Sequence, residues 1–276
     1  MASVVSKFKG TVFLIANGSR NLGRICAENF VQRGGRVVLC DTDTEAGEEI
    51  QESLGRNNCL FFTADLTKEE DVEKAINLTE EKFGKLDVTI NCPSYARTSK
   101  IHIKSQIERE NSHENTQTET RGEKLTEEFM EKLLRENLTS TFNVCRLSAG
   151  LMSKNEPDSN GQRGVIINKS HTLGFGSSLV PYTMSQAAII GMTLPMARDF
   201  NDLGIRVNSI ATGFLDYQIP EGWPKKRERK FCSLMAFPHK LGSSQTFYHL
   251  CEKIIDNPYV NGEVIKLDAG VQAVIL

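Results

Sequence analysis

The sequence is poor in the features that mark several protein classes. No stretch approaches the roughly 18 consecutive apolar residues of a membrane-spanning helix, so no membrane span is expected. The seven cysteines include no Cys-x-x-Cys pair. Several lie within apolar runs, which favours buried reduced thiols over a disulfide framework, and we expect no metal site. The net charge of −2 argues against a general nucleic-acid-binding surface.

Residues 11–41 have the pattern of a strand, a turn, a helix and a second strand. TVFLIA at 11–16 is a short apolar run rich in β-branched residues, NGSRNLG at 17–23 is a turn, and an amphipathic helix follows it. The second apolar run ends in Asp41. An acidic residue about 20 positions after such a turn is typical of a dinucleotide site. Asp41 would accept hydrogen bonds from the adenosine ribose hydroxyls, which favours NAD over NADP.

The length and the pattern both favour one large α/β domain. A chain of 276 residues forms one such domain more easily than two, and strand-like and helix-like patterns alternate along it. The predicted strands are 11–16, 35–41, 59–64, 86–91, 164–168, 205–210 and 263–267. We predict a single domain over residues 1–276, a Rossmann-type doubly wound parallel sheet of about seven strands with helices on both faces.

Two threonines mark the starts of predicted helices. Thr67 and Glu70 have the spacing of a capping box, which predicts a helix that runs to about Phe83. Thr126 is predicted to cap a helix whose pattern continues to about Met152. A long, mostly apolar helix is predicted over 182–203, buried on one face or at a dimer interface.

Two polar segments interrupt the regular pattern. Residues 97–124 are charged and almost free of large apolar side chains after Ile107, and we expect a surface insertion, either solvated or partner-binding. A predicted loop over 211–241 contains the basic run 225–230. This run could contact phosphate, of RNA or of a coenzyme A tail, or form a solvated helix face.

The amino-terminal segment is basic. The first acidic residue is Glu28, which follows Lys7, Lys9, Arg20 and Arg24. This composition resembles a mitochondrial targeting bias, although the first predicted strand leaves little sequence free for cleavage. The alternative is a short basic segment without a targeting role in a cytoplasmic protein.

The chain resembles the short-chain dehydrogenase/reductase family over nearly its whole length. The strand–turn–helix unit, Asp41, Asp65, Asn91 and Tyr182 carry the resemblance. Longer stretches are similar to the branch that oxidises 3-hydroxyacyl-CoA and 17β-hydroxysteroids: 141–158, 161–168, 189–200 and 257–268. This resemblance implies a mitochondrial, NAD-dependent homotetramer of lipid metabolism, with acyl-CoA or steroid substrates. It also implies a scaffold role in a mitochondrial tRNA-processing complex.

The resemblance also implies site residues, matched position by position. The family's catalytic tyrosine falls on Tyr182, its lysine on Gln186, its serine on His171 or, after a register shift, on Ser170, and its helix asparagine on Asn137. The matched cofactor contacts are Gly18, Arg20, Leu22, Gly23, Asp41, Asp65, Leu66, Asn91, Cys92, Leu215 and Tyr217.

Five of the family's motifs depart from their usual form. Asn17 and Asn21 replace two glycines of the turn, and asparagine is the non-glycine residue best suited to a left-handed conformation. The serine and lysine positions are changed, as are the segments 91–94 and 212–213. Without the lysine, Tyr182 should titrate like an ordinary phenol. Three hypotheses follow: an oxidoreductase with impaired or lost activity and weakened or lost NAD binding, a working dehydrogenase that uses Tyr182, or a non-catalytic scaffold.

Overall fold

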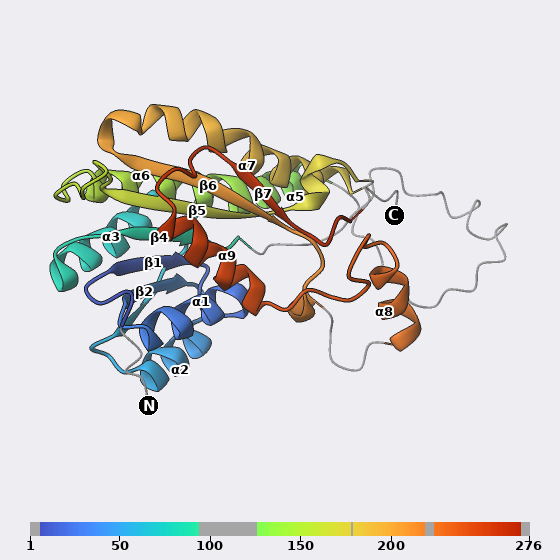
Figure 1. The fold of residues 1–276 in the computed structure, drawn as a ribbon, viewed down its shortest axis with the longest axis horizontal. Coiled ribbons are helices and arrows are strands. Elements are labelled where there is room, and N and C mark those ends of the chain that lie inside the picture. The colour runs from blue at the N-terminus through green and yellow to red at the C-terminus, as the bar shows by residue number, and fades with distance from the viewer. Residues whose placement is uncertain (1–5, 94–125, 178, 219–223, 272–276) are drawn as a thin grey trace, which may run out of the picture.

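A seven-stranded parallel sheet forms the centre of the computed structural model, which describes residues 6–93, 126–177, 179–218 and 224–271 (Figure 1). The strand order is β3-β2-β1-β4-β5-β6-β7. The strands are β1 (Val12–Ala16), β2 (Arg36–Asp41), β3 (Cys59–Thr63), β4 (Val88–Asn91), β5 (Gly164–His171), β6 (Ile205–Thr212) and β7 (Val264–Leu267). The order reverses between β1 and β4, so the doubly wound sheet is confirmed. The predicted insertion at 97–124 lies outside the described residues.

Helices cover both faces of this sheet. They are α1 (Asn21–Gln32), α2 (Thr44–Leu54), α3 (Glu69–Phe83), α5 (Glu127–Leu134), α6 (Ser140–Met152), α7 (Val180–Asp199) and α9 (Gln245–Asp256). A further helix, α8 (Lys225–Cys232), stands apart from the sheet (Figure 1). Figure 1 shows α6 and α7 over one side of the sheet and α1 and α2 on the other. A π-helical turn, Arg135–Thr139, connects α5 to α6.

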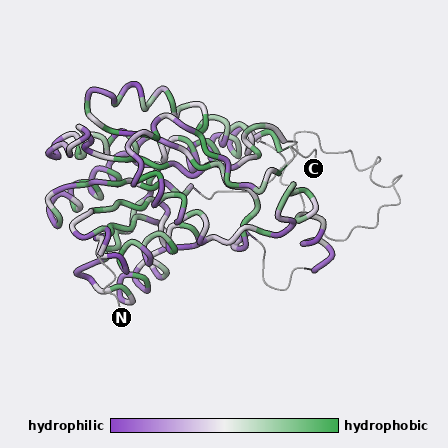
Figure 2. The backbone as a smooth tube through the Cα atoms, in the orientation of Figure 1, coloured by the Kyte–Doolittle hydropathy of each residue, from purple (hydrophilic) through white to green (hydrophobic). Residues whose placement is uncertain are grey.

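Two hydrophobic cores result, one on each face. Phe13 and Ile15 of β1 pack with residues of α1 and α9, whereas Leu14 and Ala16 pack with residues of α3, α6 and α7. Side chains alternate along a strand, so a central strand buried on both faces must be apolar throughout. Figure 2 shows hydrophobic colouring in the central strands and mixed colouring along the helices that cover them.

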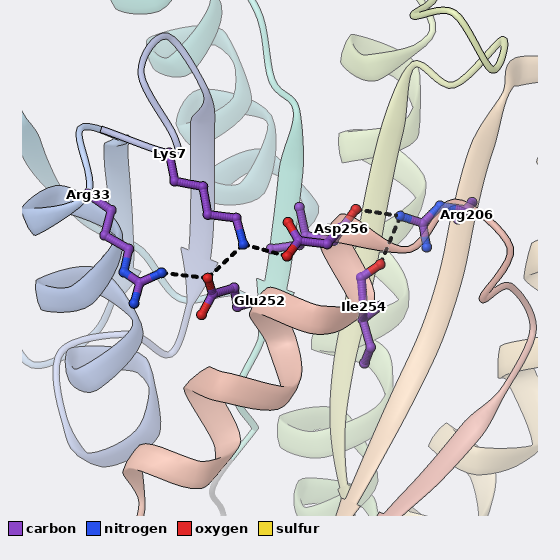
Figure 3. A network of polar contacts seen from close by, with 7 residues as sticks. Lys7, Arg33, Arg206, Glu252, Ile254 and Asp256 are labelled. Atoms are coloured by element: carbon purple, nitrogen blue, oxygen red, sulfur yellow. Dashed lines mark hydrogen bonds and ion pairs between the residues drawn. The ribbon is translucent and has the colours of Figure 1, made fainter. Parts of the chain in front are cut away.

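Charged side chains, of which Glu252 and Arg206 are buried, hold α9 and the neighbouring elements together (Figure 3). Glu252, whose side chain is 8% exposed, accepts a hydrogen bond from Lys7 at 2.6 Å and pairs with Arg33. Arg206 of β6 donates from Nη2 to the carbonyl oxygens of Ile254 and Ile255, at 3.0 and 3.1 Å. Because carbonyls of the last helical turn have no partner within the helix, Arg206 acts as a buried cap for α9.

Several predicted boundaries were wrong. The predicted capping box does not form: α3 begins after Lys68, which makes no side-chain capping bond, and the Thr67 hydroxyl donates to Asp65 instead. Strands β5 and β6 extend to His171 and Thr212 because they pair with each other over eight positions. By contrast, the Thr126 hydroxyl caps α5 as predicted, accepting from the Phe129 N–H at 3.2 Å.

The cysteines and the basic run have clear positions. All seven cysteines are free and six are buried, which confirms the prediction of buried thiols.

The basic run lies on α8, so the predicted loop contains a helix. In the part of the chain that the structure describes, no helix is long and apolar enough to span a membrane.

Candidate functional site

The turn between β1 and α1 keeps its left-handed geometry although two of its glycines are replaced. Asn17 and Asn21 have φ angles of 53° and 50°, which confirms that asparagine takes the left-handed conformation here. The two glycines that remain, Gly18 and Gly23, leave no space for a side chain. A Cβ on Gly18 would lie 2.8 Å from the carbonyl oxygen of Ile15, and one on Gly23 would lie 2.4 Å from the Cα of Gly18. A side chain at either position would therefore clash with the backbone of β1 or of the turn.

Asp41 fixes this turn from the end of β2. Its Oδ2 accepts from the backbone N–H and the hydroxyl of Ser19, at 3.1 and 2.6 Å. Its Oδ1 accepts from the N–H groups of Thr42 and Asp43, at 2.8 and 3.3 Å. A carboxylate offers about four acceptor positions. A ribose hydroxyl would therefore have to displace one of these donors.

A cleft of about 260 Å³ opens above the turn. It crosses the carboxyl ends of β2, β1, β4 and β5, where open α/β sheets bind ligands. Its lining consists of Asn17, Ser19, Arg20, Asn21, Leu22, Asp41, Thr42, Asp43, Cys92, Pro93, Lys169 and Tyr217. The N-terminus of α1 faces this cleft with no side-chain cap and no acidic residue in its first turn. The helix dipole and orphan N–H groups there favour an anion.

The structure places only part of the predicted cofactor set in this cleft. Arg20, Leu22, Asp41, Cys92 and Tyr217 line it, and Arg20 forms an ion pair with Asp43. The others lie elsewhere, as follows. Gly18 and Gly23 lie beneath the turn, Asp65 and Leu66 follow β3, Asn91 bonds to Asn168 at 2.8 Å between β4 and β5, and Leu215 is in the core.

Tyr182, in the first turn of α7, is 6% exposed. Burial, followed by the neighbouring Tyr217, raises the pKa of Tyr182 well above its ordinary value, so the expectation that it titrates like an ordinary phenol was wrong. Gln186, one turn further along α7, is fully buried; its Nε2 donates to the Ser185 hydroxyl at 3.4 Å and its Oε1 has no partner. A neutral amide stands where a cation would lower the phenol's pKa.

His171 is the candidate donor beside Tyr182, with ring centroids 5.9 Å apart. Burial, followed by the charge of Lys169, lowers the pKa of His171 to about 3, so its imidazole is neutral at pH 7. Its Nδ1 accepts from the Leu173 N–H at 3.1 Å, which assigns the ring proton to Nε2. His171 can therefore donate a hydrogen bond to an oxygen atom but cannot supply a charge.

The alternative serine position is not supported by the strand geometry. Ser170 and His171 are consecutive residues of β5, and consecutive side chains of a strand point to opposite faces. Since the His171 ring contacts Tyr182, Ser170 faces the other way. Its buried hydroxyl has no hydrogen-bond partner among the described residues.

Asn137 lies within the π-helical turn between α5 and α6, a distortion often found at functional sites. Its Nδ2 donates to the Ser185 hydroxyl at 3.2 Å, and that hydroxyl donates to the Tyr182 carbonyl oxygen at 2.9 Å. Ser185 therefore joins Asn137 to the helix that carries Tyr182 and Gln186, a role that the sequence did not indicate.

Lys169 is the most consequential residue that sequence reasoning missed. It lies on β5 two positions before His171, is 3% exposed and lines the cleft. Its Nζ donates to the Pro93 carbonyl oxygen at 3.2 Å, and burial lowers its pKa to about 8. The signal available in the sequence was a lysine directly after the run GVIIN, which was predicted to be a strand.

These residues fit one half of a dinucleotide better than the other. The left-handed turn and the uncapped N-terminus of α1 suit a diphosphate, and Asp41 would accept a ribose hydroxyl only by releasing one of its present donors. Lys169 and Tyr217 belong to the cleft lining, whereas Tyr182, His171 and Gln186 do not. Among the described residues, no cluster of three or more His, Cys, Asp or Glu side chains could hold a metal ion.

Known proteins resemble the chain along its whole length. The family model for short chain dehydrogenases matches residues 11–228. The chain is 40% identical to 3-hydroxyacyl-CoA dehydrogenase type-2 of Homo sapiens over 274 residues, 99% of each protein. It is 36% identical to the Drosophila melanogaster protein of that name over 266 residues, 96% of this chain and 98% of the relative. The crystal structure of 3-hydroxyacyl-CoA dehydrogenase type-2 from Mycobacterium avium has a TM-score of 0.84, 26% identity, and coverage of 97% and 98%.

Proposed function

The chain belongs to the short-chain dehydrogenase family, and from this premise we propose that its oxidoreductase chemistry is impaired or lost. Its ancestry is that of the 3-hydroxyacyl-CoA dehydrogenase type-2 proteins, whose name gives 3-hydroxyacyl-CoA as the substrate class to test first. Hydroxysteroids are the second class. The cofactor proposed for the cleft is NAD, because Asp41 stands where a ribose 2′-phosphate would be repelled.

The observation that supports this proposal is that Gln186, a neutral residue, lies one helical turn after Tyr182 on α7. Oxidation of an alcohol requires a base for the hydroxyl proton, and a phenol must be ionised to serve. Burial holds the pKa of Tyr182 above its ordinary value. Gln186 carries no charge to counter that burial. At neutral pH the tyrosinate is therefore too scarce to support efficient turnover.

Comparison of the unmodified protein with Tyr182→Phe tests the proposal. NADH-dependent reduction of acetoacetyl-CoA and NAD-dependent oxidation of 3-hydroxybutyryl-CoA are measured at pH 7. We expect both proteins to give the same residual rate, because the hydroxyl of Tyr182 no longer contributes. A rate for the unmodified protein at least tenfold above that of Tyr182→Phe would overturn the proposal.

That contrary result would favour the second candidate, a working dehydrogenase. His171 supports it, since a neutral imidazole with its proton on Nε2 can polarise a substrate carbonyl as a hydroxyl does. In this case Tyr182 would act as a proton donor in carbonyl reduction, which needs the neutral phenol. The rate of reduction would then be nearly constant from pH 6 to pH 8.

The third candidate is a scaffold, and exposed groups support it. Phe142 of α6 and Met184 and Leu194 of α7 are 47%, 48% and 45% exposed, so both helices carry exposed apolar side chains that a homo-oligomer, a tetramer by family resemblance, would cover. Lys225 and Lys226 are exposed on α8 and could contact tRNA in a mitochondrial processing complex. Salt-sensitive tRNA binding that is lost on neutralising these lysines would support the role. Absent or salt-insensitive binding would refute it.

A further inference from the structure

Lys169 is a buried cation that has no ion-pair partner among the described residues, although the carboxylates of Asp41 and Asp43 line the same cleft. Its ammonium has one hydrogen bond from the structure, to a neutral carbonyl oxygen of Pro93 at 3.2 Å. Among the described residues no carboxylate forms an ion pair with it. Lysine is almost never fully buried unless it is paired, because desolvating a charge is costly. The residue therefore indicates a missing anion.

The surroundings of Lys169 define where that anion would lie. Lys169 shares the cleft with Asn21 and Leu22, the first residues of α1. This helix has 12 residues, and its N-terminus has neither a side-chain cap nor an acid in its first turn. A group with two linked negative charges would find both the helix N-terminus and the ammonium in the lining of this one cleft. Two independent features of the cleft thus favour the same kind of ligand.

We propose that Lys169 is the buried counter-charge for the diphosphate of a nucleotide bound in this cleft. The inference rests on the proposed function only in taking this cleft as the cofactor site. It does not require nicotinamide or chemistry at Tyr182. The ligand class is a nucleoside diphosphate, free or as part of a larger cofactor, with its ribose directed towards Asp41.

Other roles for Lys169 fit the geometry less well. Burial and the neighbouring Tyr217 raise the pKa of Tyr182, whereas the charge of Lys169 lowers the pKa of His171. The lysine is thus no replacement for the cation missing from α7. A purely structural role would leave the ammonium desolvated for one neutral hydrogen bond, which an apolar side chain of similar size would improve.

Calorimetric titration at pH 7 tests the proposal with ADP, which has the diphosphate and no nicotinamide, and with adenosine, which has neither. The variants are Lys169→Met and Lys169→Gln, two neutral side chains of similar length. Lys82→Met is the matched control because Lys82 is exposed on α3. Thermal melts establish that each variant is folded, and the glutamine variant carries the test if the methionine variant is not.

We expect the unmodified protein and Lys82→Met to bind ADP equally and adenosine much more weakly. Loss of the Lys169 ammonium should weaken ADP binding about 10- to 100-fold, the range for a charge-assisted hydrogen bond. Equal or tighter ADP binding by the Lys169 variants would overturn the proposal, and so would absence of ADP binding by the unmodified protein. None of these outcomes depends on turnover, so the comparison with Tyr182→Phe is decided separately.

Discussion

Restoring the missing cation in Gln186→Lys should lower the pKa of Tyr182. Residues four apart on a helix have Cβ atoms about 5–6 Å apart. At an effective dielectric constant of about 20, a unit charge about 6 Å from a phenolate stabilises it by about 3 kcal/mol, or about 2 pKa units. At a pH well below both pKa values, this shift raises the tyrosinate population about 100-fold. The rate of alcohol oxidation should rise by a similar factor if cofactor and substrate bind.

Two assays separate these steps. Ultraviolet absorbance at alkaline pH follows phenol ionisation without any cofactor, and the difference between Gln186→Lys and the neutral control Gln186→Met isolates the effect of the charge. NAD-dependent oxidation of 3-hydroxybutyryl-CoA then measures the chemical consequence. The reasoning is refuted if the two variants show the same tyrosine titration. A shifted titration without increased turnover would place the remaining defect in cofactor or substrate binding.

Three further predictions concern other parts of the chain. Burial lowers the pKa of Lys169 to about 8, so its charge is present at pH 7 and mostly lost by pH 9. ADP affinity, measured by calorimetry, should therefore fall about tenfold over that interval. Cys92, Tyr217 and His171 do not titrate between pH 7 and pH 9, because the pKa values of Cys92 and Tyr217 are raised and that of His171 is about 3. A constant affinity would count against the anion role. Asn21→Gly should change the free energy of unfolding by less than about 1 kcal/mol, whereas Asn21→Val should lower it by about 1–2 kcal/mol, because only valine is strained at positive φ. Denaturant titrations measure both values, and equal losses would show that the left-handed backbone at this position does not decide the stability. Arg206→Met removes hydrogen bonds to Gln162, Ile254, Ile255 and Val260 and should cost about 2–4 kcal/mol, so an unchanged melting temperature would contradict the capping role.

The architecture could be predicted from local signals because they agree with tertiary structure here. β1 is apolar at every position, which indicates a strand buried on both faces, and the structure buries all five residues. The asparagines of the turn were predicted from backbone preference alone, and their φ angles confirm it. Backbone preference at one residue does not depend on distant partners.

The site was harder to predict because it depends on such partners. The sequence ends β5 at Asn168, since Lys169, Ser170 and His171 are polar. Pairing with β6 extends the strand through all three residues, and only this extension puts Lys169 and His171 on one face. Likewise, the sequence suggests that Asp41 is available to a ribose, whereas the structure shows its oxygens engaged by Ser19 and the following backbone. Acceptor saturation is a property of the folded turn.

The buried positive charge of Lys169 connects the two proposals. In the family pattern one lysine on the α7 helix would serve both the tyrosine and the cofactor. Here α7 carries neutral Gln186, and a cation stands instead on β5 at Lys169, where it lines the cleft without lowering the pKa of Tyr182. A charge in that position favours an anionic ligand but provides no catalytic base. Nucleotide binding and proton transfer, which one side chain would couple, are therefore separable in this chain: Lys169→Met should weaken ADP binding without changing the tyrosine titration, and Gln186→Lys should do the reverse.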